Sequence, residues 1–331
     1  MKILVVTGGL SPEREISFLS GKRVASSLLY AGHDVAIIDV ANDVSPFTPF
    51  KSLANNGLEQ LEKLTALPKK PLGDGVLELA RRADAVFPAL HGGMGENGVL
   101  KAVFEAAGIK VAGNSSKAET VSMDKHLSKL LFCECGLKTP KWQVLKKGKS
   151  ARISGLSYPL CIKPLSGGSS VGVSFAANES ELKNSLKACF EVEDTALIEE
   201  KAVGREFSVG VVLGGALPPI EIKPKSGFYD YKNKYVAGLT DEICPAKITP
   251  NEDAALRKAA LLAAKALGLD TVSRSDMIMT DSGEIYLIET NANPGMTETS
   301  LLPKEAEAAG IDFYTLVKRL LDASANKKIL S

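Results

Sequence analysis

The sequence lacks long apolar segments. No apolar run approaches the roughly 18 residues that a membrane-spanning helix requires. The N-terminal MKILVVTGG reads as a short buried strand that runs into glycines, and no signal-peptide cleavage pattern follows it. We therefore expect a cytoplasmic protein without a membrane partner.

An excess of one charge sign is also absent. Lys and Arg total 40, Asp and Glu total 39, and the net charge is +1. This balance creates no global field that would attract nucleic acid or an acidic membrane surface, although it does not exclude local patches. We expect small-molecule partners and no nucleic acid.

Cysteines are few and scattered. There are five, an odd number, and only Cys133 and Cys135 lie close together. Two residues apart on a predicted helix, they point to different faces, which argues against a metal or redox pair and favours reduced thiols. With 331 residues, 45% of them hydrophobic, the chain is long enough for two or three domains with a sizeable core.

The N-terminal part shows the pattern of an α/β domain. Strand-like runs at residues 3–6, 35–40 and 85–90 are separated by helical patterns, which predicts a doubly wound parallel sheet in a first domain over residues 1–115. Residues 45–75 mix Pro, Asn, Gly and Lys, so we interpret them as a surface excursion.

The rest of the chain predicts two further parts. A helix over residues 122–136 leads into short strands and a glycine-rich segment, which predicts a small mixed domain over residues 116–200. Longer strands then lead into an α+β part over residues 201–331.

The segment 271–300 is the most informative. Its two strands flank an Asp-Ser-Gly turn, and because side chains two apart share a face, Arg274 lies with Asp276 and Glu289 with Asn291. Three such oxygen ligands suit a hard ion such as Mg²⁺ completed by substrate phosphates. A solvated sheet face is the alternative from this segment alone.

A second candidate is the glycine-rich loop over residues 163–172. Lys163 ends a strand, and the following loop is rich in backbone N–H groups suited to covering phosphates. The loop is neither a Walker A nor a Rossmann fingerprint, and glycines that serve only a turn are the alternative.

Four weaker signals accompany these two. Paired acids in residues 197–206 suit adenine and ribose contacts, and the aromatic and lysine-rich residues 228–238 suit a lid over a nucleotide. HGGMGENG (91–98) places His91 at the carboxyl edge of the parallel sheet, and Glu15 lies in or near the first turn of a helix beside the same edge. Solvated acids, an exposed loop, a structural turn and a dipole-favoured glutamate are the respective alternatives.

Taken in order, these motifs resemble those of the D-alanine–D-alanine ligase family of the ATP-grasp superfamily. The resemblance spans about residues 3–322 and rests on EREIS, HGGMGENG, SMDK, KP..GGSSVG, LIEE...GREFSV, FYDYKNKY, RSDM and ETNANPGMTETSL. It implies an ATP-grasp fold, α/β and α+β, with an N-terminal doubly wound parallel-sheet domain. It also implies a homodimer.

The resemblance assigns roles to individual residues. Two Mg²⁺ ions, with Mn²⁺ as a substitute, are assigned to Asp276, Glu289 and Asn291. ATP is assigned to Lys125, Lys163, Glu199, Glu200, Ala202 (through its backbone), Glu206 and Lys234. The D-alanine substrates are assigned to Glu15 (ammonium of the first), Arg274 and the Gly295 N–H (reacting carboxyl oxygen), Ser300 and Leu301 (second substrate) and His91. Ser169 and Tyr235 are assigned to a link between the lid and Glu15.

The implied reaction phosphorylates the first D-alanine with ATP and releases phosphate when the second D-alanine attacks. Tyr235 favours a dipeptide product over one containing D-lactate, while D-serine stays open as a second substrate. The segment LSGG before Ser169 and Asn97 depart from common family patterns, which leaves details of lid closure open. A noncatalytic nucleotide-binding homologue is the alternative from a different class.

Overall fold

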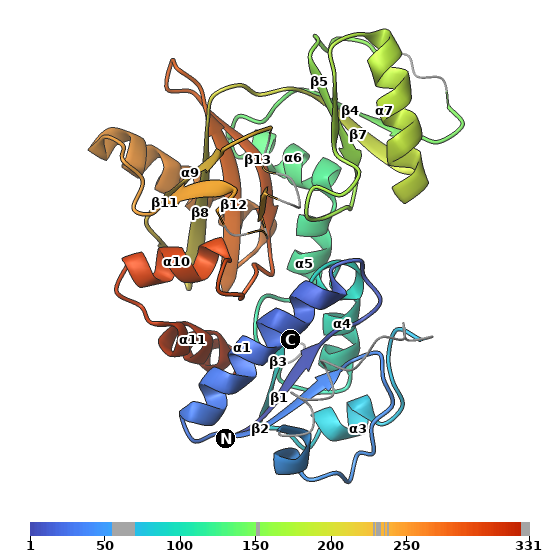
Figure 1. Ribbon diagram of the computed structural model, residues 1–331, viewed down its shortest axis with the longest axis vertical. Helices are drawn as coiled ribbons and strands as arrows, with labels where there is room; N and C mark the ends of the chain where they lie inside the picture. The colour runs from blue at the N-terminus through green and yellow to red at the C-terminus, as the bar shows by residue number, and fades with distance from the viewer. Residues whose placement is uncertain are drawn as a thin grey trace.

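The structure is a computed structural model. It describes residues 1–54, 70–149, 153–227, 229, 233–234, 236 and 238–325. Three sheets follow one another along the chain, each with its own helices (Figure 1). The predicted combination of a parallel α/β part with later mixed sheets is therefore observed.

The N-terminal sheet is parallel, in the order β2-β1-β3. Its strands are almost fully buried because helices cover both faces, as expected for a doubly wound sheet. The elements are β1 (Lys2–Thr7), α1 (Arg14–Tyr30), β2 (Asp34–Asp39), α3 (Val76–Ala80), β3 (Ala85–Pro88), η1 (Gly93–Gly95) and α4 (Val99–Ala106). Part of the predicted surface excursion, residues 55–69, lies outside the described residues.

The helix predicted over residues 122–136 is wrong in its extent. The structure has two helices there, α5 (Ser116–Met123) and α6 (Lys125–Glu134). Asp124 separates them with an extended ψ of 103°, and its carboxylate accepts hydrogen bonds from the N–H groups of His126 and Leu127. Asp124 is thus an N-cap, which starts a new helix where apolar periodicity alone suggested continuation.

The central sheet has four antiparallel strands in the order β4-β7-β5-β6, with α7 packed against it. Its elements are β4 (Trp142–Lys146), β5 (Leu160–Pro164), β6 (Ser174–Ala176), α7 (Glu179–Val192) and β7 (Thr195–Glu200). β5 is buried along its whole length and ends at Lys163 and Pro164. The glycine-rich loop therefore starts from a rigid strand.

The third sheet has the order β11-β10-β8-β12-β13, with the short β9 beside β8. Its elements are β8 (Arg205–Val212), β9 (Gly215–Ala216), β10 (Ile220–Pro224), β11 (Thr240–Ile243), α9 (Pro250–Leu267), β12 (Val272–Met279), β13 (Ile285–Asn291), α10 (Leu301–Ala308) and α11 (Phe313–Ala325). The two strands predicted around the Asp-Ser-Gly turn are confirmed as β12 and β13, which pair antiparallel. α9 covers one face through a row of buried alanines and leucines.

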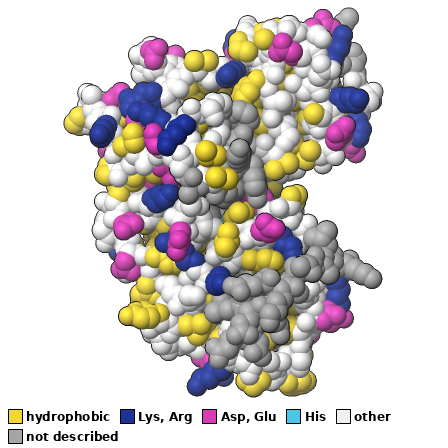
Figure 2. All heavy atoms as spheres, viewed as in Figure 1, with side chains coloured by type: hydrophobic (Ala, Val, Ile, Leu, Met, Phe, Trp, Pro, Cys, Tyr) yellow, Lys and Arg dark blue, Asp and Glu magenta, His cyan; other side chains and the backbone are white. Residues whose placement is uncertain are grey.

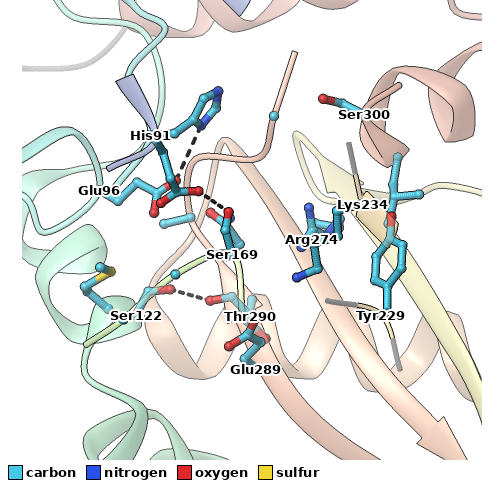
Figure 3. Close-up of a pocket in the computed structure, with 18 of the residues that line it drawn as sticks. His91, Glu96, Ser122, Ser169, Tyr229, Lys234, Arg274, Glu289, Thr290 and Ser300 are labelled. Carbon is cyan, nitrogen blue, oxygen red and sulfur yellow. Dashed lines mark hydrogen bonds and ion pairs between the residues drawn. The ribbon is translucent and has the colours of Figure 1, made fainter. Parts of the chain in front are cut away.

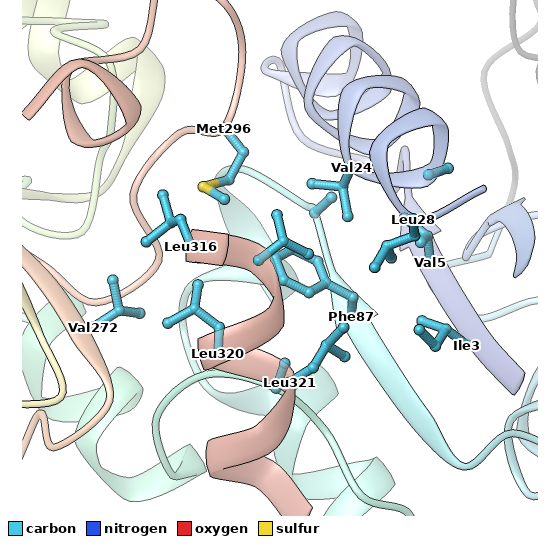
Figure 4. Packing of buried hydrophobic residues seen from close by; sticks show 14 of the residues in the cluster. Ile3, Val5, Val24, Leu28, Phe87, Val272, Met296, Leu316, Leu320 and Leu321 are labelled. Atoms are coloured by element: carbon cyan, nitrogen blue, oxygen red, sulfur yellow. The ribbon is translucent and has the colours of Figure 1, made fainter. Parts of the chain in front are cut away.

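The C-terminal helix α11 returns to the N-terminal sheet. Leu316, Leu320 and Leu321 pack with Val24 and Leu28 of α1 in a core that also contains residues from β1 and β3 (Figure 4). Fully burying such aliphatic side chains stabilises a fold by about 1.5–3 kcal/mol each. This shared core ties the start and end of the chain together and fixes the N-terminal part against the third sheet.

The described surface shows no single-sign field. Figure 2 shows Lys and Arg interspersed with Asp and Glu over the visible face, as the balanced composition predicts. Among the described residues, no helix combines the length and apolar character needed to cross a membrane.

Candidate active site

Two neighbouring cavities lie beside β12 and β13. The larger, about 580 Å³, lies between the central sheet and the third sheet. The smaller, about 100 Å³, is bounded by the loop after β3, the glycine-rich loop and the third sheet. Their walls share Lys125, Gly167, Gly168, Tyr229, Lys234 and Glu289. A molecule in the large cavity can therefore reach a molecule in the small one.

The large cavity gathers the residues assigned to the nucleotide. All seven line it, although they come from α6, β5, β7, β8 and the segment before β11: Lys125, Lys163, Glu199, Glu200, Ala202, Glu206 and Lys234. Apolar side chains including Val173, Phe175 and Ile278 complete its wall. Such a cavity, in which apolar side chains and many charged groups converge, suits a small, highly charged molecule.

Glu199, which the sequence interpretation placed near adenine, forms ion pairs with two lysines in the structure. Its carboxylate is buried and forms ion pairs with Lys163 (2.6 Å) and Lys129 (2.8 Å). Burial raises the pKa of Glu199, but the two lysines outweigh it and hold the pKa below its usual value. The carboxylate thus anchors Lys163 at the cavity wall, a role that sequence spacing does not reveal.

Glu206, assigned to ribose, has an unusual protonation equilibrium. Burial and the nearby Asp276 raise its pKa to about 7, against the opposing effect of Lys234. Near neutral pH the carboxyl group is therefore both a donor and an acceptor of hydrogen bonds, depending on its proton. Either form suits the hydroxyl groups of a sugar.

The three assigned metal ligands meet on one face of the sheet. Asp276 pairs with Glu289 and Arg274 with Asn291 across β12 and β13, as the two-residue spacing predicted. Arg274 binds Asp276 through Nε (3.0 Å) and Nη2 (2.8 Å), and Ser208 donates to the same carboxylate (2.8 Å). In the structure the carboxylate of Asp276 is therefore already paired with the positively charged side chain of Arg274.

The charge state of Glu289 suits a metal ion. Burial raises its pKa, but the surrounding lysines and Arg274 bring the pKa down to about 2, so the carboxylate is charged. Lys125 Nζ lies 3.6 Å from it. Among the described residues, no group of three or more His, Cys, Asp or Glu forms a complete metal cage. Two carboxylates and the Asn291 amide fit Mg²⁺, which keeps water and phosphate oxygens as its other ligands.

Acidic groups and His91 form one side of the small cavity (Figure 3). His91 Nε2 lies 2.8 Å from the Ser20 hydroxyl, and His91 Nδ1 lies 3.5 Å from Glu96. Glu13 lies beside them, and burial together with Glu96 raises its pKa above the ordinary value. This side can receive a cation.

The assignment of Glu15 to this cavity is wrong. Glu15 is exposed and does not line the cavity, whereas Glu13 is buried and does. α1 begins at Arg14, so Glu13 precedes the helix and its carboxylate lies beside Gly92 in the loop after β3, while Glu15 lies on the exposed side of the first turn. Arg14 pairs with the buried Asp39, and this fixes the helix start.

The glycine-rich loop closes over Glu13. The Ser169 hydroxyl donates to the Glu13 carboxylate (Figure 3), and a Cβ on Gly168 would lie 2.9 Å from a Glu13 oxygen. Ser169 and Ser170 adopt φ of 46° and 60°, which is uncommon for residues other than glycine. Tyr235, and with it most of the predicted lid over residues 228–238, lies outside the described residues.

The opposite side of the small cavity is formed by Arg274, Gly295, Ser300 and Leu301. Figure 3 shows Arg274 and Ser300 across the cavity from His91 and Glu96. Ser300 is the N-cap of α10, and its Oγ accepts the Thr297 N–H (3.0 Å). The first N–H groups of α10 have no partner within the helix, which favours an anion there.

Comparisons with known proteins agree with this geometry. The protein-family model described as D-ala D-ala ligase N-terminus matches residues 2–114, and the one described as D-ala D-ala ligase C-terminus matches residues 131–322. The chain belongs to the D-alanine–D-alanine ligase family. The ATP-grasp fold predicted from the resemblance is thereby confirmed.

Individual members of the D-alanine–D-alanine ligase family match over nearly the whole chain. The chain is 37% identical to a D-alanine–D-alanine ligase of Syntrophotalea carbinolica over 99% of this chain and 97% of the relative. It is 38% identical to one of Citrifermentans bemidjiense over 98% and 97%.

Solved structures of ligases are also similar. The D-alanine–D-alanine ligase of Bacillus anthracis complexed with ATP matches with a TM-score of 0.78 and 29% identity, covering 98% of this chain and 97% of the other. The VanG D-Ala:D-Ser ligase of Enterococcus faecalis matches with a TM-score of 0.81 and 29% identity, covering 98% and 99%.

The sequence interpretation of this D-alanine–D-alanine ligase family member missed three residues around the cavities. Glu13 stands two residues from the assigned Glu15 in EREIS, and only the start of α1 decides between them. Glu96 lies within the HGGMGENG motif, which was expected at the sheet edge, so its place beside the cavity could have been predicted. Lys129 had no signal, because its pairing with Glu199 joins α6 to the central sheet.

Proposed function

We propose that the protein ligates two D-alanine molecules to D-alanyl-D-alanine at the expense of ATP, for peptidoglycan precursor synthesis. The observation that carries the proposal is the connection between the two cavities. Glu289, Lys125 and Lys234 line both, so a nucleotide phosphate in the large cavity would meet a carboxylate in the small one. This arrangement serves phosphoryl transfer by positioning and charge neutralisation, which supply most catalysis in such reactions.

ATP occupies the large cavity in this proposal, with its phosphates towards β12 and β13. Lys125 and Lys163 come from different elements but face the same wall, and Lys234 reaches it from the segment before β11. Their positive charges offset the triphosphate. Lys125 now donates to the Gly167 carbonyl (2.5 Å), so a phosphate would compete for it as the glycine-rich loop closes.

The first D-alanine occupies the small cavity. Glu13 receives its ammonium group, and Arg274 with the Gly295 N–H receives a carboxyl oxygen. The other carboxyl oxygen attacks the γ-phosphorus and ADP leaves, which produces an acyl phosphate. The amine of the second D-alanine then attacks the acyl carbon, the C–O bond to phosphate breaks, and the amine loses a proton. Arg274 stabilises the negative charge on oxygen in the tetrahedral intermediate.

Asp276, Glu289 and Asn291 would hold two Mg²⁺ ions, for which Mn²⁺ is a substitute. When bound, such ions would neutralise phosphate charge and help to orient the triphosphate. Arg274 contacts both oxygens of Asp276, so a cation bound there would share the carboxylate with the guanidinium and weaken that ion pair. Glu289 would likewise be shared, because Lys125 Nζ lies 3.6 Å from its carboxylate.

The second substrate would be held by Ser300 and the first turn of α10. Ser300 and Leu301 line the small cavity at the start of α10, where a carboxylate would gain from the helix N-terminus. Ser300 and Leu301 bind any α-carboxylate equally well. D-serine, the second substrate named for the VanG neighbour, and D-lactate are therefore the alternatives.

The same proposal covers the setting of the enzyme. It acts in the cytoplasm as a homodimer, with D-alanine and ATP as its small-molecule partners and with neither nucleic acid nor membrane. Its three functional parts are residues 1–115, 116–200 and 201–331. A noncatalytic nucleotide-binding protein with this scaffold is disfavoured by the complete set of charged groups around both cavities.

The experiment that tests the function is turnover of purified protein with Mg-ATP and D-alanine. We expect stoichiometric release of ADP and D-alanyl-D-alanine, and no turnover with L-alanine. Mixtures of D-alanine with D-serine or D-lactate, resolved by mass spectrometry, measure the choice of second substrate. A protein that gains thermal stability with nucleotide but releases no ADP would be a binder, and the proposal would be wrong.

Replacing Glu13 by glutamine should raise the KM for the first D-alanine by about 10- to 100-fold. The ammonium group would lose a charged partner, and hydrogen bonds to charged groups contribute roughly 1.5–3 kcal/mol. Glu15→Gln is the matched control, since Glu15 is exposed and two residues away. Steady-state kinetics at saturating ATP measure both variants. Equal KM values for the two would remove Glu13 from the substrate site.

A further inference from the structure

Glu305 is a buried acid outside the machinery described above. It lies in α10, and its side chain is completely excluded from solvent. Neither carboxylate oxygen has a hydrogen-bond partner of normal geometry among the described residues. An unpaired buried polar group destabilises a fold, and more so when it is charged. Its presence in the core of the third part therefore calls for a physical reason.

Glu305 lies close to Arg274, next to the residue that pairs with it across the sheet. Gly210 of β8 pairs directly with Arg274 of β12, so both project to the same face of the sheet. A Cβ on Gly210 would lie 2.5 Å from a Glu305 oxygen, and so the missing side chain leaves the space that the carboxyl group fills. The chain thus combines a glycine on the strand with an acid on the helix beside one arginine.

Electrostatics agree with this placement. Burial raises the pKa of Glu305 to about 8, and Asp276 contributes in the same direction. Arg274 and the Gly210 N–H lower the pKa of Glu305. The guanidinium therefore acts electrostatically on the Glu305 carboxyl group, although no ion pair within 4.0 Å joins them. Arg274 is paired with Asp276, and its effect on Glu305 does not outweigh burial. With a pKa of about 8, Glu305 is largely uncharged at neutral pH.

Arg274 has conflicting tasks in the proposed reaction. It now binds both oxygens of Asp276, the same oxygens that a cation needs. A cation bound to Asp276 would weaken the only ion pair of Arg274 among the described residues, and would add a second positive charge close to the guanidinium. A buried charge that loses its partner is strongly destabilising. Metal binding would carry that cost unless another acid took over.

We propose that Glu305 is a positioning residue that receives Arg274 when Asp276 binds a divalent cation. This inference rests on the proposed function. Glu305 then accepts hydrogen bonds from one edge of the guanidinium, while the remaining N–H groups of Arg274 stay directed at the substrate carboxyl oxygen that does not attack phosphorus. Glu305 touches neither substrate nor cation. Its effect is to compensate for the weakened Arg274–Asp276 pair and to keep Arg274 in the small cavity.

The test compares Glu305→Leu and Glu305→Gln with wild type. Glu307→Gln is the matched control, because Glu307 lies on the exposed side of the same helix. Thermal unfolding without metal should show that Glu305→Leu is at least as stable as wild type, since it removes an unpaired buried acid. Calorimetric titration of Mg²⁺ into protein saturated with ADP should show affinity at least 10-fold weaker in both Glu305 variants and unchanged in Glu307→Gln.

Turnover supplies the second readout. Both Glu305 variants should lose at least 10-fold in kcat at subsaturating Mg²⁺, with a KM for D-alanine within about twofold of wild type. Mg²⁺ affinity and kcat within twofold of wild type in both variants would overturn the inference. If Glu305→Leu does not fold, the isosteric Glu305→Gln decides by the same two measurements. Wild-type protein without turnover would refute the proposed function, whereas the calorimetric comparison would still decide the role of Glu305.

Discussion

Replacing Arg274 by alanine should lower kcat by about 100- to 1,000-fold, which corresponds to roughly 2.7–4 kcal/mol for the loss of one oxyanion donor. Arg274 lies across the small cavity from His91 and Glu96 (Figure 3). In the proposed reaction it holds the carboxyl oxygen that becomes negatively charged in the tetrahedral intermediate. Because that charge appears only in the transition state, the KM values for ATP and D-alanine should change far less than kcat. Steady-state kinetics with each substrate varied in turn measure the split.

Arg274→Lys separates charge from geometry. Lysine retains the positive charge but lacks the planar fork that makes the bidentate contact with Asp276. We expect kcat between that of Arg274→Ala and wild type. Thermal unfolding of each variant checks that the fold persists. A normal kcat in Arg274→Ala, or a loss confined to KM, would contradict an oxyanion role for Arg274.

The second large effect concerns stability. Glu199→Gln should lower the free energy of unfolding by about 3–5 kcal/mol, because it leaves two buried lysines without their shared counter-charge. Lys129 and Lys163 both contact the Glu199 carboxylate, and all three side chains are almost fully buried. Chemical denaturation monitored by tryptophan fluorescence at Trp142, which lies opposite Glu199 in the sheet, measures the change.

Two controls isolate the charge balance. Glu200→Gln alters a neighbouring acid that is partly exposed, and it should change stability by less than about 1 kcal/mol. Lys129→Met removes one of the two lysines but keeps the Lys163–Glu199 pair, so it should cost much less than Glu199→Gln. A similar loss in Lys129→Met and Glu199→Gln would show that packing, and not charge, stabilises this cluster.

The pH dependence of the Glu199 effect follows from its pKa. The folded-state pKa is lower than the ordinary value, so the contribution of Glu199 is complete above the unfolded pKa, about 4.3. It is lost only as the pH falls through the lower folded pKa. The stability difference between wild type and Glu199→Gln should therefore stay constant between pH 5 and pH 8 and shrink in stronger acid.

Local sequence patterns predicted the parts of the fold that depend on short-range spacing. The alternation along residues 271–291 placed Arg274 with Asp276 and Glu289 with Asn291, and the strand pairing brought these two sets face to face. The buried N-terminal strands and the glycine-rich loop after β5 were predicted for the same reason. In each case the period of the element decides which side chains meet.

The predictions that were wrong concern features that residue spacing alone does not determine. Glu13 and Glu15 fit EREIS equally well, and the start of α1 at Arg14 decides which of them enters the cavity. The helix break at Asp124 depends on a side chain that caps α6. The partners of Glu199 and the setting of Glu305 come from elements far apart in the chain, so only the assembled fold reveals them.

The central claim is that the carboxylate of the first D-alanine is phosphorylated by ATP in the small cavity. Turnover of D-alanine whose carboxyl oxygens carry a heavy isotope tests this directly, because the phosphorylated oxygen leaves with the phosphate. Mass spectrometry of the released phosphate should find one labelled oxygen per molecule. The other carboxyl oxygen of that first D-alanine should be found in the new amide. Unlabelled phosphate released alongside dipeptide would contradict the account.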